Sequence, residues 1–281
     1  MTSVPTQNIY NDPSFFNAYS TLPRSEHGLA GAPEWPVLRD MVGGASGVQD
    51  QMTLDLGCGY GWFARWAADH GAKRVRAIDV SEKMIRRAKE LDGEGRGGMI
   101  DYEIRDLETL TAAEDERDKY DLVYSSLTFH YVEDLGRLLR EIRSCLLGGS
   151  SSATNFKAGK KSSSTRKGRF VFSVEHPICT APISPAPDWS LVRDETNTER
   201  KVWPLNNYSE EGLRVTSWLG TAGVQKYHRT VETYVSLLLE NGFVLTGLKD
   251  WVPSLEDVRA HPEWREERHR PYFLLVSAEI A

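Results

Sequence analysis

The sequence predicts an α/β fold in which a seven-stranded, mostly parallel β-sheet carries helices on both faces. Between residues 35 and 144, apolar runs of strand length alternate with amphipathic runs of helix length, the order typical of parallel strands joined by crossover helices. A glycine-rich turn follows the first of these strands. The last two predicted strands are not joined by a long crossover helix. A length of 281 residues favours one large domain with insertions over two equal domains.

Each predicted strand is a short apolar run bounded by glycine or polar residues. These runs cover residues 52–56, 74–78, 99–104, 120–124, 169–174, 243–251 and 272–279. A helix-compatible segment at 62–68 follows the glycine turn. Ser81 caps the next helix, and Asp134 begins a helix whose apolar stripe ends at Gly148. A helix capped by Thr230 precedes the last two strands.

Three segments fall outside this alternation. Residues 1–34 are too polar for the sheet and precede the main domain at 35–281. Residues 149–167 are rich in Ser, Gly and Lys and predict a flexible surface insertion, with a basic contact for an acidic partner as the less favoured alternative. Residues 177–227 are too long for a plain loop and, with their tryptophans, predict a lid or acceptor-binding segment. Pro177 cannot continue a central strand, so the chain leaves the sheet there.

Composition excludes several functional classes. The net charge of −6 provides no basic field for nucleic acid or an anionic membrane, and no apolar run reaches 18 residues. The polar start of the chain lacks the apolar region of a secretory signal. Three widely spaced cysteines favour neither a disulfide framework nor a zinc cluster. We therefore expect a cytoplasmic protein without a bound metal, and the oligomeric state stays open.

The glycine turn and the acid after the second strand predict a nucleoside site. Asp79 lies at the tip of that strand, about 20 residues past the turn, where a carboxylate accepts both hydroxyls of a ribose. Dinucleotide sites read G-x-G-x-x-G, whereas this turn reads G-x-G-x-G at Gly57, Gly59 and Gly61 and contains no Lys or Arg to meet phosphate. With Asp55 two residues before it, the turn suits a cationic, phosphate-free ligand such as S-adenosylmethionine. A simple structural turn is the alternative.

At these residues the sequence resembles the class I methyltransferases, whose first motif is D-x-G-x-G-x-G. The wording Leu-Val-Tyr-Ser-Ser-Leu-x-Phe-His-Tyr at 122–131, Phe-Ser-Val-Glu-His-Pro at 172–177 and the opening Asn-Ile-Tyr-Asn-Asp-Pro are similar to small-molecule members of that family. The resemblance spans most of the chain and implies a sheet whose last strand runs antiparallel. In that family a short Pro-Gly-Gly turn joins the preceding helix to the fifth strand, so the 149–167 insertion departs from the family pattern.

The resemblance implies a set of cofactor contacts. Gly57 and Gly59 would pass under the methionine and ribose, Asp106 would accept from the adenine amino group, and Leu107 would face the ring. Ser125 would lie near the methionyl part, and residues 1–34 would fold over the cofactor. The expected cofactor residues are Asp55, Gly57, Cys58, Gly59, Asp79, Val80, Asp106, Leu107, Ser125, Tyr19 and Arg24. Turn capping by Asp106, strand termination by Ser125 and surface packing by Arg24 are the alternatives.

Methyl transfer from a sulfonium is an in-line displacement that needs alignment, and it needs a base only when the acceptor is protonated. The candidates for that base are His176, His130, His228 and Glu175, because histidines that follow strands fall at the edge where α/β ligands bind. A hydrogen-bonded structural histidine is the alternative for each. The expected activity is methylation of a small-molecule acceptor at oxygen or nitrogen. An S-adenosylmethionine-binding protein without transfer chemistry stays open, and the glycine spacing disfavours a dehydrogenase.

Overall fold

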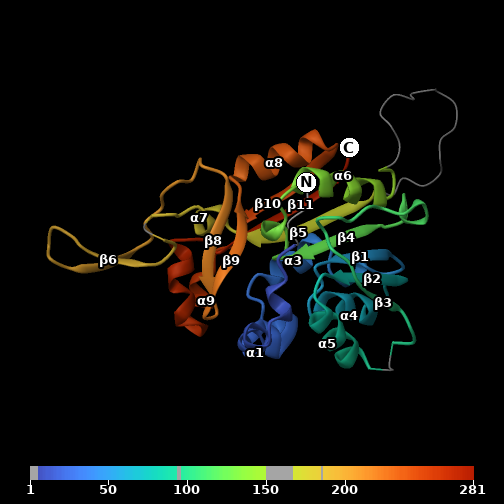
Figure 1. Cartoon of the computed structure of the whole chain (residues 1–281), viewed down its shortest axis with the longest axis horizontal. Coiled ribbons are helices and arrows are strands. Elements are labelled where there is room, and N and C mark those ends of the chain that lie inside the picture. Colours follow the sequence, from blue (N-terminus) through green and yellow to red (C-terminus); the bar gives the residue numbers. More distant parts are fainter. Residues whose placement is uncertain (1–5, 94–95, 150–166, 185) are drawn as a thin grey trace.

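A computed structural model describes residues 6–93, 96–149, 167–184 and 186–281. Its centre is a seven-stranded sheet with the order β10-β11-β5-β4-β1-β2-β3 (Figure 1). Strands β3, β2, β1, β4 and β5 are parallel neighbours, whereas β11 is antiparallel to both β5 and β10. The predicted α/β sheet and its antiparallel last strand are confirmed.

The seven sheet strands lie within two residues of the predicted bounds. They are β1 (Met52–Leu56), β2 (Arg74–Asp79), β3 (Ile100–Ile104), β4 (Leu122–Ser126), β5 (Arg169–Glu175), β10 (Phe243–Asp250) and β11 (Phe273–Ile280). The remaining strands form two separate antiparallel hairpins, β6 (Ser190–Arg193) with β7 (Glu199–Val202) and β8 (Gly212–Trp218) with β9 (Thr221–His228).

Most helices begin at a residue suited to the start of a helix. Asp12, Ser81, Asp134 and Thr230 each accept a hydrogen bond from the first turn of the helix that follows. The α-helices are α1 (Pro13–Ser20), α2 (Pro23–His27), α3 (Trp35–Met41), α4 (Trp62–Asp69), α5 (Glu82–Asp92), α6 (Leu135–Cys145), α7 (Pro177–Thr180), α8 (Val231–Glu240) and α9 (Leu255–Ala260). Short 3₁₀ turns cover Ile9–Asn11, Gly28–Gly31, Ala45–Gly47, Glu114–Glu116, Phe129–Tyr131 and Pro262–Arg268.

Both faces of the sheet are buried under helices, because side chains alternate between the two faces along each strand. One core lies under α6 and α8 and includes Leu56, Phe172 and Leu238. The other lies under α3 and α4 and includes Leu38 and Phe63. In Figure 1, α6 and α8 lie above the sheet and α3 and α4 below it. Neither face of the sheet is therefore open to a ligand, and sheets of this kind bind ligands at the carboxyl ends of their strands.

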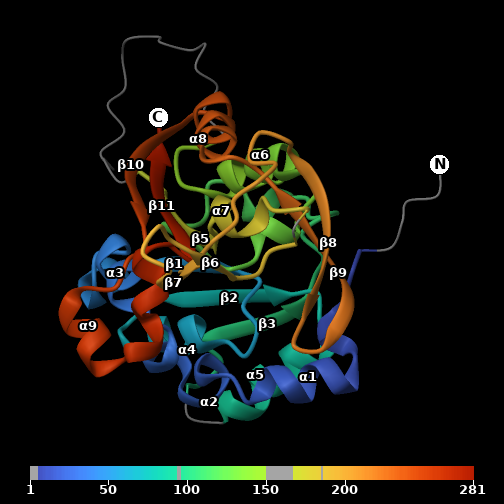
Figure 2. The same cartoon turned by 90° about the vertical axis from the view of Figure 1, so that its left-hand side faces the viewer.

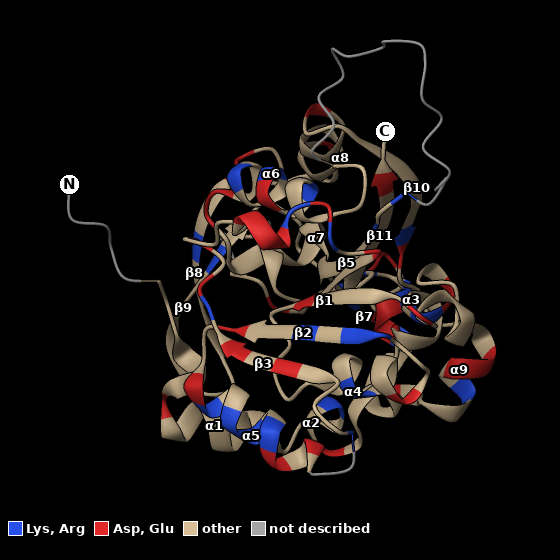
Figure 3. Cartoon of the chain, turned by 90° about the vertical axis from the view of Figure 1, so that its right-hand side faces the viewer, with Lys and Arg blue, Asp and Glu red and all other residues tan. Residues whose placement is uncertain are grey.

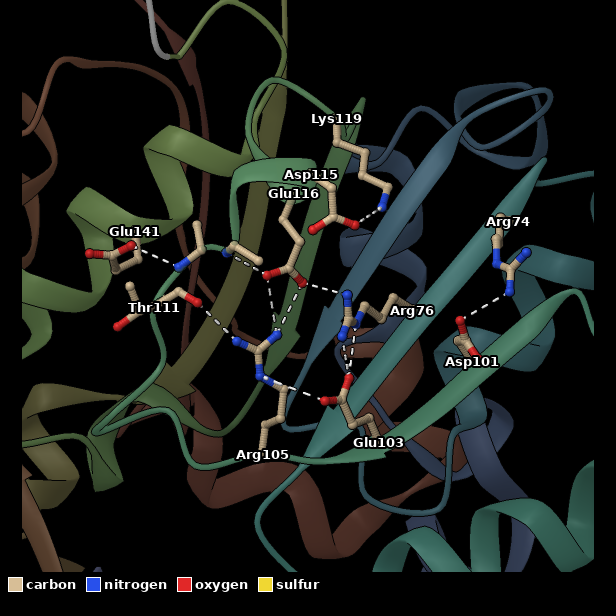
Figure 4. A network of polar contacts seen from close by, with 12 residues as sticks. Arg74, Arg76, Asp101, Glu103, Arg105, Thr111, Asp115, Glu116, Lys119 and Glu141 are labelled. Atoms are coloured by element: carbon tan, nitrogen blue, oxygen red, sulfur yellow. Dashed lines mark hydrogen bonds and ion pairs between the residues drawn. The ribbon is translucent and has the colours of Figure 1, made fainter.

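Ion pairs cover the β3 side of the sheet, where β3 is the edge strand. Arg76 on β2 pairs with Glu103 on β3 and, through Nη1, with the buried Glu116 at 2.5 Å. Arg105 donates to Glu116 from the other side at 3.0 Å (Figure 4). Charged side chains on an edge strand disfavour pairing with a further strand. This network links β2 to β3 and so holds in place two strands whose ends carry site residues.

The segment 177–227 leaves the sheet as predicted, but it contains hairpins that the sequence did not reveal. The hairpin β6–β7 has mostly exposed residues, so its sequence shows no alternation of apolar and polar positions. The hairpin β8–β9 reaches from the level of α6 to α1 (Figures 1 and 2). At its turn Trp218 packs on Phe15 of α1, with ring centroids 5.3 Å apart.

The stretch between the last two sheet strands is more ordered than the sequence indicated. The dense charges of residues 256–270 predict a solvated excursion, and most of these residues are indeed exposed, but they form α9 and a 3₁₀ segment. Ser254 forms a capping box at the start of α9, and Trp264 packs on Trp251 with centroids 5.8 Å apart. Arg270 is only 7% exposed. The dense charges of this stretch hid its aromatic and buried positions. Most of the predicted 149–167 insertion lies outside the described residues.

Candidate active site

A cavity of about 680 Å³ opens at the carboxyl ends of β1, β2, β4 and β5. This volume is typical of a site for a small ligand. The sheet contributes the turns and loops that follow these strands, and the opposite wall comes from residues 6–24 and from the hairpin β8–β9. β2 ends in an acidic residue, Asp79, on the edge that faces β8 and β9 (Figure 3). The cavity is therefore where α/β sheets bind ligands.

The glycine turn between β1 and α4 lies against the cavity. Gly57 has φ +72°, and a Cβ there would lie 2.2 Å from Oγ1 of Thr128, so only glycine fits. A Cβ on Gly59 would meet no atom within 4 Å, although its φ of +53° still favours glycine. Cys58 lines the same wall, and burial raises the pKa of its thiol. The turn thus exposes backbone to a ligand on the cavity side.

Two carboxyl groups face this turn. Asp79 accepts hydrogen bonds from the Gly59 N–H at 2.9 Å and the Ser81 N–H at 2.8 Å, and burial raises its pKa. Asp55 is 2% exposed, and its Oδ2 has no partner among the described residues. Burial, followed by repulsion from Asp79, raises the pKa of Asp55 to about 8. A cationic ligand beside these groups would relieve both effects.

Asp106 and Leu107 lie where the adenine is expected. Both line the cavity, and Leu107 is 7% exposed. Asp106 Oδ1 accepts the Glu108 N–H at 2.9 Å, so it caps the following turn, which was the alternative reading for this residue. Its Oδ2 accepts from the Thr6 hydroxyl at 2.5 Å. An adenine amino group would occupy the position that Thr6 holds here.

The N-terminal segment crosses the cavity from the sheet to the hairpin. The Asn8 side chain donates to the Val80 carbonyl at 3.0 Å, and Gln7 exchanges two hydrogen bonds with the backbone of Gln225 on β9. Tyr10 and Tyr19 line the cavity, with ring centroids 5.3 Å apart. Residues of this segment from Thr6 onward line the cavity, and the role of residues 1–34 as a cover over the cofactor stays a prediction.

Arg24 also reaches the cavity but is already engaged. Its Nη2 lies 2.6 Å from Glu34 Oε1, and Glu34 is fully buried. Its Nη1 lies 3.4 Å from the Ser126 hydroxyl. If Arg24 pairs with the carboxylate of a methionyl group, it would have to use the edge that faces Ser126, because Glu34 occupies the other nitrogen.

His130 and Glu175 form the acceptor-side wall. His130 is 4% exposed, and its Nδ1 accepts the Glu175 N–H at 3.3 Å, which assigns the ring proton of neutral imidazole to Nε2. Burial lowers the pKa of His130 to about 3. Burial alone would raise the pKa of Glu175, but the Lys226 ammonium at 2.7 Å holds it below its usual value. His130 is thus a neutral donor rather than a ready base.

Three predicted site residues do not line the cavity. His176 turns toward β10, where its Nε2 lies 2.9 Å from Asp250, and its Nδ1 accepts the Ile178 N–H. His228 is fully buried between the Thr180 hydroxyl and the Tyr208 carbonyl. Ser125 donates to the Leu56 carbonyl within the sheet. The expectation that His176 and His228 serve as bases in the cavity is corrected here. A hydrogen bond to Asp250 holds the His176 ring away from the cavity, and bonds to Thr180 and Tyr208 do the same for His228.

Several cavity residues were missed or named only as part of a longer segment. They are Ser126, Thr128, Tyr131, Trp218, Gln225, Lys226 and Tyr227. Tyr131 could have been inferred from its place after the fourth strand. Lys226 could not, because its role depends on how a hairpin with no recognisable pattern folds back on the sheet.

Neither a metal centre nor a membrane span is found in the part of the chain that the structure describes. No group of three or more His, Cys, Asp or Glu side chains there could hold an ion. Within the same residues, no helix has the length and apolar character needed to cross a bilayer.

The fold and the cavity define a class I, Rossmann-like methyltransferase. Residues 54–152 match the family described as a methyltransferase domain. The chain is 30% identical over 276 residues to an uncharacterized protein of Haemophilus influenzae, covering 96% of each chain. It is 41% identical to an S-adenosylmethionine-dependent methyltransferase of Mesorhizobium loti, with a TM-score of 0.73 over 90% of this chain and all of that one. The chain belongs to the S-adenosylmethionine-dependent methyltransferases.

The cavity suits this cofactor on its own chemistry. The carboxyl of Asp55, with an unpartnered oxygen, offers a counter-charge to a sulfonium or an ammonium. Asp79 at the tip of β2 is placed where it would accept from the hydroxyls of a ribose, and the wall at Gly59 leaves room for close approach. Among the cavity residues, the glycine turn presents no cationic side chain to a phosphate.

Proposed function

We propose that this enzyme methylates a small-molecule acceptor at oxygen or nitrogen. The supporting observation is the extension of the cavity beyond the cofactor residues, into a region walled by the loop after β4, the tip of β5 and the hairpin β8–β9. Aromatic rings line this region. Tyr131 lies 6.4 Å from Tyr10, and Trp218 lies 6.2 Å from Tyr19, between ring centroids. Walls of this kind suit a compact, partly apolar acceptor better than a polymer.

The residues of the chain supply alignment more than acid–base chemistry. S-adenosylmethionine provides an electrophilic methyl group, and its thioether leaves without protonation. Aromatic walls exclude water and hold the acceptor, an effect that reaches ~7–11 kcal/mol for well-oriented reactants. The Nε2–H of His130 is available to hydrogen-bond an acceptor oxygen or nitrogen, because Nδ1 is occupied by the Glu175 N–H. His130 therefore takes the role of a positioning donor in this proposal, replacing the role of base.

We also propose that the enzyme acts in the cytoplasm and that its acceptor is not a nucleic acid. The net charge of −6 disfavours a nucleic-acid acceptor. All three cysteines are free thiols, which suits the reducing cytoplasm.

Transfer of labelled methyl from S-adenosylmethionine tests the proposal. Fractions of small metabolites below about 1 kDa, protein and RNA from the same cells are offered separately as acceptors. Label in the small-molecule fraction supports the proposal, and hydroxide lability then separates O-methyl esters from N-methyl products. Label confined to protein or RNA would contradict it. The Asp79→Ala enzyme is the control, assayed at a cofactor concentration that the natural enzyme binds but the weakened site of the variant does not.

A further inference from the structure

A second pocket of about 200 Å³ adjoins the main cavity behind the hairpin β8–β9. The two pockets share the wall formed by Glu175, Trp218, Lys226 and Tyr272. The far side of this side pocket comes from α7, from Trp203 after β7, and from Arg270 just before β11. A ligand in the acceptor region of the main cavity would therefore lie next to the side pocket.

The side pocket has the opposite charge character to the cofactor end of the main cavity. Its lining includes the cations Arg214, Lys226 and Arg270 but only one carboxylate, Glu175. Lys226 is engaged with Glu175 at 2.7 Å. Arg214 donates to backbone carbonyls, including that of Ala181 at 3.1 Å. Of these three cations, Arg270 is the one with a buried donor, Nε, that has no acceptor among the described residues.

Arg270 is held in place by aromatic rings. Its guanidinium carbon lies 5.0 Å from the ring centre of Trp189, 4.5 Å from that of Trp203 and 4.9 Å from that of Tyr272. The residue is 7% exposed. Flat rings on several sides fix a guanidinium plane and remove much of its rotamer freedom, so less entropy is lost when it binds an anion.

The hydrogen bonds of Arg270 are incomplete. Nη2 alone donates to Glu267, at 3.0 Å to Oε1 and 3.2 Å to Oε2. Nε is buried without an acceptor, and Nη1 donates to no acceptor among the described residues. A buried donor without a partner destabilises the fold, and more so when the group is charged. A purely structural arginine would be expected to use these donors on nearby carbonyls, as Arg214 does.

We propose that the side pocket binds a carboxylate group of the methyl acceptor, with Arg270 as its anchor. A carboxylate supplies the acceptors that the Arg270 donors lack, and the indole and phenol rings accommodate the apolar part that carries it. The enzyme then acts on a small organic acid, methylated at a position that the anchored carboxylate leaves in the main cavity. This assignment rests on the proposed small-molecule methylation.

Benzoate and its neutral isostere benzamide test the assignment. Both are titrated by calorimetry into the protein saturated with adenosylhomocysteine, at constant ionic strength. We expect benzoate to bind at least tenfold more tightly than benzamide and to quench tryptophan fluorescence, since Trp189 and Trp203 flank Arg270. Equal binding of the two, no binding of benzoate, or binding of inorganic phosphate in its place would overturn the carboxylate assignment.

Variants locate the binding. Arg270→Gln should weaken benzoate at least tenfold with unchanged affinity for adenosylhomocysteine, and Arg270→Lys should recover part of the loss. Arg268→Gln is the matched control, because Arg268 lies two residues before Arg270, at the end of the 3₁₀ segment, is exposed and lines neither pocket. Benzoate binding that is unaffected by Arg270→Gln would place the anion elsewhere. If Arg270→Gln does not fold, the benzoate–benzamide comparison on the natural sequence still decides. If benzoate binds but no small molecule is methylated, the proposed function is refuted and the carboxylate site is not.

Discussion

Asp79, at the tip of β2, both bonds to the backbone around it and faces the cavity. Its carboxylate holds the Gly59 and Ser81 N–H groups, and it faces the cavity where a ribose is expected. The backbone bonds fix the orientation of the carboxylate before a ligand arrives. Loss of the side chain should therefore affect binding more than a surface carboxylate would.

Asp79→Ala should weaken adenosylhomocysteine binding by roughly 1.5–3 kcal/mol, the scale of a hydrogen bond to a charged group. Calorimetry measures the change, and a thermal melt confirms that the variant is folded. Asp101→Asn on β3 is the control, because that carboxylate is exposed and pairs only with Arg74 at 3.0 Å. Unchanged affinity in the Asp79 variant would refute the ribose assignment.

His130 should stay neutral, with its proton on Nε2, throughout the working pH range. Burial lowers its pKa to about 3, so the ring does not gain a proton between pH 5 and pH 8. Nitrogen NMR of labelled histidine should show a single Nε2–H tautomer over that range. A titration near pH 6.5, or an Nδ1–H tautomer, would restore His130 as a candidate base. Turnover of His130→Gln should exceed that of His130→Ala, since glutamine keeps an N–H donor.

The hairpin β8–β9 is joined to the sheet by one ion pair in addition to its aromatic contacts. Lys226 on β9 meets Glu175 at the end of β5, and both side chains are nearly buried, with 12% and 13% exposed. Lys226 also lies 5.5 Å from the ring centre of Trp218. The pair therefore fixes the wall that the two pockets share.

Lys226→Met should destabilise the fold by about 3–5 kcal/mol, because it leaves the Glu175 charge buried without a partner. The double variant Glu175→Gln/Lys226→Met should recover much of this loss. Urea denaturation measures both. Lys201→Met is the matched control, since the Lys201–Glu266 pair is 43% and 38% exposed and should contribute at most about 1 kcal/mol. A Lys226 variant as stable as the Lys201 variant would show that the hairpin does not depend on this pair.

The insertion after α6 should be dispensable. Gly149 donates to the Leu146 carbonyl at 2.9 Å, and Gly168 donates to the Leu147 carbonyl at 3.0 Å, so both ends are anchored on adjacent residues. Replacing residues 150–166 with two glycines should leave the melting temperature and turnover nearly unchanged, because a short linker closes this gap at small entropic cost. A large loss of either would show that the basic segment contacts the body of the enzyme or its acceptor.

The cofactor end of the main cavity is acidic, whereas the side pocket next to its acceptor region is cationic. Asp55, Asp79 and Asp106 line the main cavity at one end, and Arg270 lies behind the hairpin at the other. This separation suits a cationic methyl donor and an anionic acceptor, because each ligand meets the charge that complements its own.

Adenosylhomocysteine at 100 times its dissociation constant should stabilise the protein by about 2.7 kcal/mol and raise its melting temperature by roughly 5–10 °C. NAD at the same concentration should leave the melting temperature unchanged, because the glycine turn has no spacing or cation for a pyrophosphate. Differential scanning calorimetry of the full chain measures both. Equal stabilisation by NAD would contradict the assignment of the nucleoside.

Sequence patterns predicted the sheet and the cofactor end well, because both depend on local signals. Strand periodicity, helix caps and the D-x-G-x-G-x-G turn are written within a few consecutive residues. The positions of Asp79 and Asp106 were predicted on the same basis, since each lies at or just past the end of a strand. The histidines show where it fails: His130 and His176 both follow strands of the sheet, yet the bond from His176 to Asp250 turns its ring out of the cavity.

The sequence by itself determined the class of fold, the position of the cofactor turn and the choice of S-adenosylmethionine over a dinucleotide, since neighbouring residues along the chain specify all three. Tertiary structure decided which side chains meet on the acceptor side. Lys226 and Arg270 lie in segments without a recognisable period, and they face Glu175 and the side pocket only because the hairpin and the last strand fold against β5. Contacts between such distant residues depend on packing, and no spacing along the chain encodes them.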